Sequence, residues 1–97
     1  MAIPTIILTA HLTIATVTGY TSTGRRCADL SWPKVGDCAA PRSVPLHSMV
    51  LIDGKPYLVT DRLNRKWNDE RWDIYFNTSQ EALNFGKQKL TIIYKTN

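Results

Sequence analysis

Short apolar runs separated by turn-forming residues recur along the chain and predict β-strands. Residues 6–20 are rich in Thr, Ile and Val, which favour strands, and their alternation fits one long strand or two short ones. Residues 48–53 and 56–61 also have strand character. Because Asp53 and Gly54 lie between these two segments as a strong turn signal, the pair is predicted to form a hairpin.

One short helix is predicted near the C-terminus, over residues 79–85. Thr78 and Glu81 have the spacing of a capping box, in which Thr78 is the N-cap and Glu81 lies three residues further on. Gly86 is a natural C-terminal stop for this helix. The two remaining strand patterns lie on either side of the helix, at residues 72–76 and 89–95.

The polar segments between these elements predict loops. Residues 21–44 change in composition to Gly, Ser, Pro, Arg, Asp and Cys, which indicates a long loop, and long loops in compact domains are often functional. Residues 62–71 are polar and predict a second loop. Six or so short strands and one small helix indicate a mostly β fold. We expect a single domain over residues 1–97, built as a compact six-stranded barrel rather than an open sheet.

Composition adds a basic character to this picture. The apolar fraction of 43% and charged fraction of 21% are those of a globular protein and argue against a disordered chain. The formal net charge of +4 suits an anionic partner such as nucleic acid, a membrane surface or an acidic wall polymer. No nucleic-acid-binding pattern is present, so nucleic acid is not the expected partner. No segment reaches the roughly 18 apolar residues that a membrane span needs. The apolar N-terminus lacks the basic residues of a signal peptide and is interpreted as a strand.

The two cysteines, Cys27 and Cys38, are separated by ten residues. This spacing matches no zinc pattern, and only His11 and His47 could add imidazole ligands, so neither a metal nor a cofactor is predicted. We expect a disulfide between the cysteines, which would stabilise the loop by roughly 3 kcal/mol and indicate an oxidising compartment. The alternative is a pair of reduced, buried thiols.

Two aspartates interrupt apolar strands and are the candidate catalytic groups. Asp73 lies on the opposite side of its strand from Trp72, Ile74 and Phe76, so if Ile74 and Phe76 face the core, Asp73 faces a groove. Asp61 ends the preceding strand and is a plausible second carboxylate in that groove. Desolvation and a neighbouring negative charge both raise the pKa of a carboxyl group, which lets it donate a proton near neutral pH. The alternative is that each aspartate caps a turn or pairs with an arginine.

Aromatic and basic side chains near these aspartates could bind a sugar polymer. Trp32, Trp67 and Tyr20 offer apolar faces with a polar edge, which suits a carbohydrate, although core packing is the alternative for any one of them. Trp72 is expected in the core. Three basic residues could hold carboxylates of an anionic glycan or peptide, unless they only line a solvated loop: Arg62, Arg65 and Lys66.

Five segments, in this order, carry a resemblance to a known family. They are Val17-Thr18-Gly19-Tyr20-Thr21, Ala39-Ala40-Pro41-Arg42-Ser43-Val44-Pro45-Leu46, Val59-Thr60-Asp61, Trp72-Asp73-Ile74-Tyr75-Phe76 and Glu81-Ala82-Leu83-Asn84-Phe85-Gly86-Lys87. The chain resembles the three-aspartate (3D) domain family, a double-psi β-barrel related to the catalytic domain of membrane-bound lytic transglycosylase A. Most of the chain takes part in this resemblance.

The resemblance implies cleavage of peptidoglycan between N-acetylmuramic acid and N-acetylglucosamine, leaving 1,6-anhydro-muramyl ends. It assigns Asp73 as the single acid and base, and Asp61 as the second aspartate, which organises the site. It also places Tyr20 and Thr21 along the substrate groove, and Lys66 near the position of a loop lysine. We therefore expect a monomer that acts on glycan strands outside the cytoplasm.

The chain departs from the family pattern at several positions. Ala40 stands where the first aspartate is common, His47 replaces a glycine, and Leu63 and Asn64 replace a Gly-Gly pair. These departures leave open a second hypothesis, a non-catalytic wall-binding module or secreted inhibitor on the same barrel. A third hypothesis is a phage or structural protein that uses the fold for protein contacts.

Overall fold

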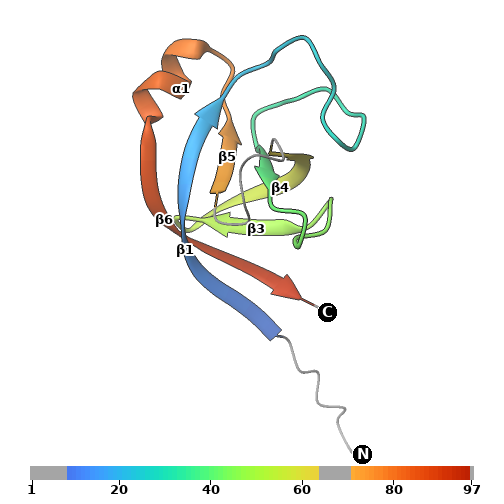
Figure 1. The fold of residues 1–97 in the computed structure, drawn as a ribbon, viewed down its shortest axis with the longest axis vertical. Helices are drawn as coiled ribbons and strands as arrows, with labels where there is room; N and C mark the ends of the chain where they lie inside the picture. The colour runs from blue at the N-terminus through green and yellow to red at the C-terminus, as the bar shows by residue number, and fades with distance from the viewer. Residues whose placement is uncertain (1–8, 64–70, 97) are drawn as a thin grey trace, which may run out of the picture.

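The computed structural model describes residues 9–63 and 71–96 of the chain. Six strands close into a barrel in the order β1-β5-β2-β4-β3-β6, and the helix α1 lies between β5 and β6 (Figure 1). This confirms the predicted mostly β fold, a six-stranded barrel with one short helix. The elements are β1 (Thr9–Tyr20), β2 (Asp37–Ala40), β3 (Met49–Ile52), β4 (Lys55–Arg62), β5 (Arg71–Tyr75), α1 (Ser79–Phe85) and β6 (Lys87–Thr96).

The strand order repeats itself in the two halves of the chain. Strands β1 and β5 are parallel, as are β4 and β2, and all other neighbours are antiparallel. Exchanging β1, β2 and β3 for β4, β5 and β6 reproduces the same set of neighbours. This pseudo-twofold arrangement agrees with the double-psi class. It also places the β5–β2 pair across the barrel from the β3–β6 pair.

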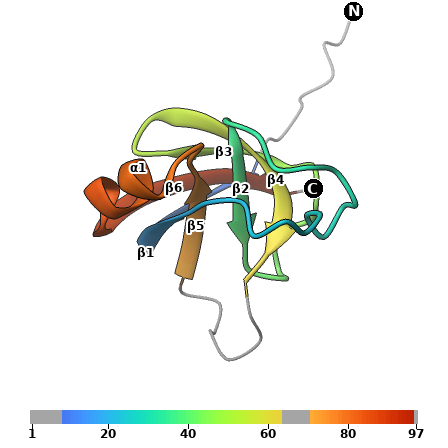
Figure 2. The ribbon, with the colours of Figure 1, turned by 90° about the horizontal axis from the view of Figure 1, so that it is seen from above.

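Alternating side chains fill the inside of the barrel. Val17 and Ile92 are fully buried, and Trp72 is 2% exposed, as expected for a core tryptophan. Gly19 permits the close approach of α1, because a Cβ atom at this position would lie 2.8 Å from the Phe76 ring and 3.1 Å from the Ala82 Cα. The helix therefore packs against β1 on one side of the barrel, whereas the loop of residues 21–36 lies on the other (Figure 2).

The predicted loop over residues 21–44 was wrong in its second half, which contains β2 (Asp37–Ala40). Strand β2 lies between β4 and β5, and all four of its residues are buried. The segment has no β-branched residue and no alternation of polar and apolar positions, which are the signals that identify a half-exposed strand. Small side chains suit a position enclosed by two neighbouring strands.

The predicted hairpin and helix are both confirmed. Asp53 and Gly54 have φ values of 52° and 78°, as the two central residues of a type I′ turn require. The Thr78 side chain accepts a hydrogen bond from the Glu81 backbone N–H at 3.1 Å, and Gly86 ends the helix with a φ of 68°. None of the helices in the described part of the chain is long and apolar enough to cross a membrane.

Candidate active-site cleft

Four residues on four neighbouring strands form one row across the barrel. Thr18 on β1 pairs with Asp73 on β5, Asp73 pairs with Ala39 on β2, and Ala39 pairs with Asp61 on β4. The two aspartates are therefore two strands apart, roughly 10 Å between their backbones. Both line a cleft of about 370 Å³. This confirms the expectation that the two carboxylates face one groove.

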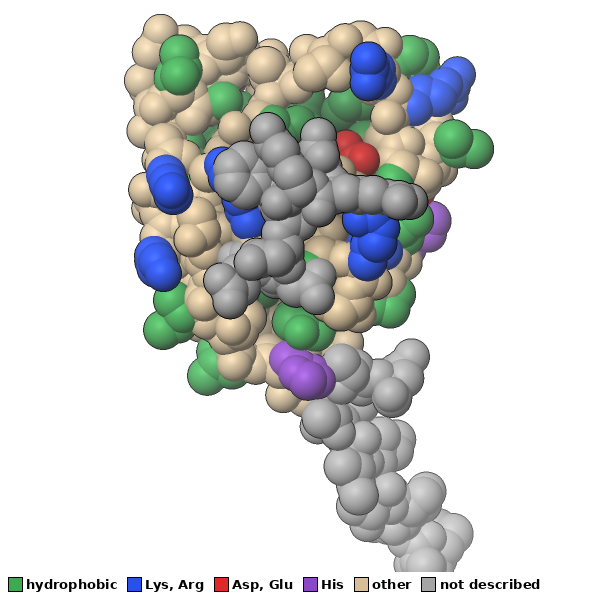
Figure 3. Space-filling model, viewed as in Figure 1, with side chains coloured by type: hydrophobic (Ala, Val, Ile, Leu, Met, Phe, Trp, Pro, Cys, Tyr) green, Lys and Arg blue, Asp and Glu red, His purple; other side chains and the backbone are tan. Residues whose placement is uncertain are grey.

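The cleft also contains residues that the sequence analysis assigned to substrate binding. Tyr20 and Thr21, at the end of β1, line it together with Arg25 and Arg26 from the following loop. On the face shown in Figure 3, an acidic side chain lies in a hollow between Lys and Arg side chains. Two other predicted binding residues lie outside the described residues: Lys66 and Trp67.

Asp73 is half-buried and has the properties of a proton donor. Its strand turns Trp72 and Ile74 into the core, which leaves the carboxyl group on the cleft side. Burial raises the pKa of Asp73 from its ordinary value of 3.8 to about 6, against the opposing effect of the Arg71 guanidinium and with a smaller contribution from Asp61. The Thr18 hydroxyl donates a hydrogen bond to Asp73 Oδ1 and so orients the carboxyl group.

Asp61 has a structural task in addition to its place in the cleft. Its Oδ1 accepts hydrogen bonds from the Ala28 backbone N–H at 3.0 Å and from the Arg62 backbone N–H at 2.8 Å. The next donor in the loop, the Asp29 N–H, bonds to the Thr60 carbonyl at 3.1 Å. The capping role that the sequence left open for Asp61 is therefore present, and it fixes the 21–36 loop at the edge of the cleft.

The loop presents an exposed tryptophan beside the cleft. Trp32 is 56% exposed, and the Arg26 guanidinium lies 4.7 Å from the centre of its ring. Arg26 Nη1 also donates to the Leu30 carbonyl at 2.9 Å, which fixes the arginine against its own loop. A second contact joins the loop to the β2–β3 connection, where His47 Nε2 lies 2.9 Å from Asp29 Oδ2. Three contacts thus hold the loop against the rest of the protein: Ala28 to Asp61, Asp29 to Thr60 and Asp29 to His47.

The Arg62 guanidinium is hydrogen-bonded to backbone carbonyl groups of the protein. Its Nη1 donates to the carbonyl oxygens of Pro41 at 2.8 Å and Val44 at 2.6 Å, with a longer contact of 3.4 Å to Ala40. These bonds stabilise the turn that follows β2. Arg62 lines the cleft, but this nitrogen is not available to bind a glycan carboxylate. Arg65, the other arginine proposed for this task, lies outside the described residues.

Both cysteines are free and buried, so the expected disulfide is not present in the structure. Cys38 is a core residue of β2 with no exposed area, and Cys27, which is part of the 21–36 loop, is 3% exposed. Burial raises the pKa of the Cys38 thiol to about 12, with a contribution from Asp37, and burial also raises the pKa of Cys27. The thiols act as small apolar groups, which was the alternative interpretation. They give no indication of an oxidising compartment.

Tyr20 presents its ring rather than its hydroxyl group to the cleft. The ring packs edge-on against Tyr75, with centroids 5.6 Å apart. The hydroxyl group is buried and has no hydrogen-bond partner in the described part of the chain. Burial, followed by the charge of Asp61, raises the pKa of Tyr20, which therefore stays protonated. A binding role for Tyr20 would use its apolar ring face.

Sequence reasoning missed two residues of the central row. Thr18 hydrogen-bonds to Asp73, and Ala39 lies between the two aspartates in the cleft. The resemblance had placed the position of the family's first aspartate at Ala40, but Ala40 is fully buried in the core. To identify either residue, one has to know which strands are neighbours and in which register they pair. A list of apolar and polar positions in one chain does not contain this information.

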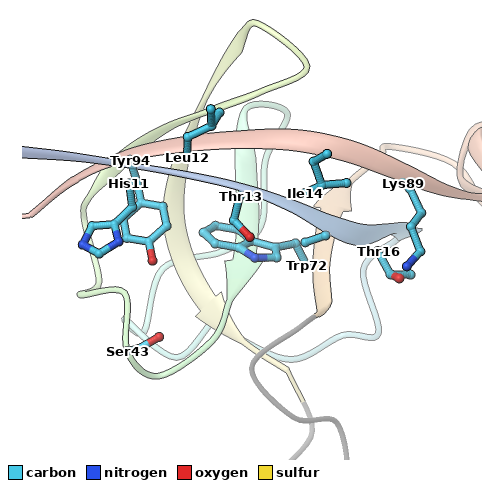
Figure 4. A pocket seen from close by; sticks show the side chains of 10 residues that line it. His11, Leu12, Thr13, Ile14, Thr16, Ser43, Trp72, Lys89 and Tyr94 are labelled. Atoms are coloured by element: carbon cyan, nitrogen blue, oxygen red, sulfur yellow. The ribbon is translucent and has the colours of Figure 1, made fainter.

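A larger cavity of about 620 Å³ lies at the other end of β1, where His11 stacks on Tyr94 with centroids 5.1 Å apart (Figure 4). None of its described lining residues carries a carboxyl group. No cluster of three or more His, Cys, Asp or Glu side chains among the described residues could hold a metal ion. The cleft therefore offers the better site for proton transfer.

Comparisons of the chain with protein-family models, with curated proteins and with solved structures gave no significant match. The three-aspartate resemblance is therefore supported only by the sequence segments that carry it. The barrel and the cleft are observed in the structure. A functional assignment has to be argued from the residues of the cleft.

Proposed function

We propose that this chain is a peptidoglycan-cleaving, lytic transglycosylase-like domain in which Asp73 is the single acid and base. One observation carries the proposal: a half-buried carboxyl group with a pKa raised to about 6 faces an open cleft. Such a group is protonated in a large fraction of molecules at mildly acidic pH and can still ionise during a reaction. Among the described residues that line the cleft, only Asp61 offers another carboxyl group.

The reaction needs one proton to be given and one to be taken back. The Asp73 carboxyl group protonates the glycosidic oxygen as the bond between that oxygen and the muramyl C1 breaks. The muramyl C6 hydroxyl group then bonds to C1, and the Asp73 carboxylate takes the hydroxyl proton. The product has a 1,6-anhydro ring, no water is consumed, and Asp73 ends in its starting state. This differs from glycoside hydrolysis by two carboxylates.

The neighbouring residues support this role. The Thr18 hydroxyl group orients the Asp73 carboxyl, and the Asp61 charge helps to keep it protonated. Tyr20 and Thr21 would contact the glycan along the cleft, with Lys66 and Trp67 as further candidates. The net charge of +4 suits an anionic polymer. The substrate implies an extracytoplasmic location, and we propose that the domain acts as a monomer.

A second candidate function is a non-catalytic glycan-binding module or secreted inhibitor on the same barrel. Ala39 favours this candidate, because it places a methyl group in the cleft between the two aspartates. In addition, Asp61 Oδ1 is already occupied by the backbone of the loop. A cleft with these two features could bind a sugar chain without cutting it.

Incubation with purified peptidoglycan separates the two candidates. Mass spectrometry should detect 1,6-anhydro-muropeptides with the wild type, and Asp73→Asn should lower the rate by at least about 100-fold, because it removes the proton donor. Asp53→Asn is the matched control, since Asp53 is exposed in the hairpin turn and asparagine suits that turn. Glycan binding by the wild type without any product would reject the enzyme and favour the binding module.

The pH dependence of cleavage tests the role of the cleft charges. Because the reactive form of Asp73 is protonated, the rate should fall about tenfold per pH unit once the pH exceeds the pKa of about 6. Asp61→Asn should move this fall to lower pH, since it removes a charge that raises the pKa of Asp73. Asparagine retains a carbonyl oxygen to accept the Ala28 N–H, so the loop stays anchored. An unchanged profile in Asp61→Asn would contradict the proposed coupling.

A further inference from the structure

The outer side of β1, β6, β3 and β4 is covered by aliphatic side chains. One register row across these strands consists of Leu12, Ile93, Leu51 and Pro56. Leu12 is 71% exposed, Leu51 39% and Ile93 36%. Figure 4 shows the side chain of Leu12 on the opposite side of β1 from those of Thr13 and Trp72. We call this surface the aliphatic face; its members are Ala10, Leu12, Ile14, Met49, Leu51, Pro56 and Ile93.

The aliphatic face is large and continuous for a protein of this size. The usual strand spacing and rise give it an extent of roughly 15 Å in each direction. Ile14 is 70% exposed and Met49 58%, so the patch continues two residues beyond the central row on both sides. A shallow hollow of about 270 Å³ between β3, β4 and β6 lies within it. Contiguous apolar patches of several hundred Å² mark protein or membrane contacts.

Lysines surround the aliphatic face. Lys89 and Lys95 lie on β6, on the same outward side as Ile93, and Lys55 lies at the hairpin. All three are exposed, and none of their side chains has an ion pair or hydrogen bond within the described residues. Asp53 is the one acidic residue that we place at this edge. Figure 3 shows Lys or Arg side chains next to hydrophobic ones along the edge formed by β1 and β6.

We propose that the aliphatic face docks on the surface of an anionic lipid bilayer. Leu12, Ile14 and Met49 would enter the boundary between headgroups and acyl chains, while the lysines contact lipid phosphates. A second copy of this chain fits less well, because it would bring two sets of lysines together. The outside of a closed barrel is also convex, so two barrels meet along few strands, whereas a lipid surface adapts to that shape.

This orientation would leave the cleft accessible. The central residues Asp73 and Ala39 of the cleft lie on β5 and β2, across the barrel from β3 and β6 at the centre of the aliphatic face. A barrel docked through that face would therefore open its cleft away from the bilayer. The proposal does not rest on glycan cleavage, because lipid binding and cleavage are measured separately and use different residues.

Co-sedimentation with vesicles tests the proposal. The wild type should bind vesicles of phosphatidylcholine with phosphatidylglycerol at least tenfold more tightly than vesicles of phosphatidylcholine alone, and salt should weaken the binding. Leu12→Asp should lower binding at least tenfold. Leu83→Asp is the matched control, since Leu83 is 74% exposed on α1, and it should bind as the wild type does. Met49→Ser is a second variant of the face in case Leu12→Asp does not fold.

A charge reversal tests the lysine rim. Lys89→Glu should weaken binding several-fold, whereas Arg25→Glu, an equal change of charge on the cleft side, should have a smaller effect. Absence of binding to the anionic vesicles, or equal loss in Leu83→Asp, would overturn the proposal. A dimer in sedimentation velocity that Leu12→Asp dissociates would assign the face to a second copy instead. A monomer that binds no vesicles until residues 1–8 are removed would assign it to the N-terminal segment.

Discussion

The two sides of the barrel each contain an antiparallel strand pair and have opposite chemistry. On one side β5 and β2 form an antiparallel pair, with Asp73 opposite Ala39. On the other side β6 and β3 also form an antiparallel pair, with Ile93 opposite Leu51. The pseudo-twofold exchange maps each pair onto itself. The β5–β2 pair is flanked by parallel pairings and the β6–β3 pair by antiparallel ones, so the two sides differ in strand arrangement as well as in side chains.

Each side also departs from the arrangement that would stabilise the barrel most. Asp73 is half-buried at a cost that its raised pKa records, and Leu12 remains 71% exposed without the gain that burial would bring. Residues that work against stability in this way often belong to functional surfaces. The comparison therefore predicts that mutations on the two sides affect stability differently, and three substitutions test it.

Ala39→Asp should have the largest effect on stability. It places a third carboxylate between Asp61 and Asp73, at a position that is 3% exposed. We expect a loss of about 2 kcal/mol in the free energy of unfolding at pH 7, because a buried charge meets two like charges. The loss should shrink toward pH 4 as the carboxyl groups become protonated. Ala39→Asn adds nearly the same volume without the charge, and an equal loss in that variant at both pH values would contradict the electrostatic account.

Asp73→Asn should have a smaller effect of opposite sign. The pKa of Asp73 is raised from 3.8 to about 6, so the folded state holds its proton more tightly than the unfolded state. The wild type therefore loses stability as the pH rises from about 4 to 6, and the asparagine variant should lose less. After allowance for partial solvent exposure, we expect a difference of about 1 kcal/mol at pH 7, measured by urea unfolding at several pH values. Parallel curves for both proteins would show that the Asp73 pKa is not raised.

Most strands and the helix could be predicted, because short-range sequence patterns determine where they begin and end. The Asp53-Gly54 turn and the Thr78 cap use residues whose conformational preferences are strong in any context. Strand β2 could not be predicted, since Asp37–Ala40 has small residues and no alternation. Its position depends on β4 and β5 closing around it. The disulfide was favoured over free thiols for a similar reason, because the spacing of Cys27 and Cys38 does not reveal that both face the interior.

The candidate site could be predicted in part. Strand alternation placed Asp73 opposite Trp72 and therefore in a groove, which the structure confirms. The Thr18 hydrogen bond and the position of Ala39 depend on a parallel and an antiparallel pairing between strands far apart in the sequence. The residue types alone do not reveal the register of these pairings. The chemistry of Asp73 was thus visible from the sequence, whereas the residues that tune it were not.

Ile14→Thr should have the smallest effect on stability and complete the comparison. Ile14 is 70% exposed on the aliphatic face, so its side chain contributes little to the core, and threonine retains the branched shape that suits a strand. We expect a change within about 0.5 kcal/mol, measured by urea unfolding. Ile92→Thr is the matched control, because Ile92 is fully buried and should cost about 2 kcal/mol or more. A large loss in Ile14→Thr would mean that this residue is covered in the free protein, and the aliphatic face would then be part of the fold rather than a surface for a partner.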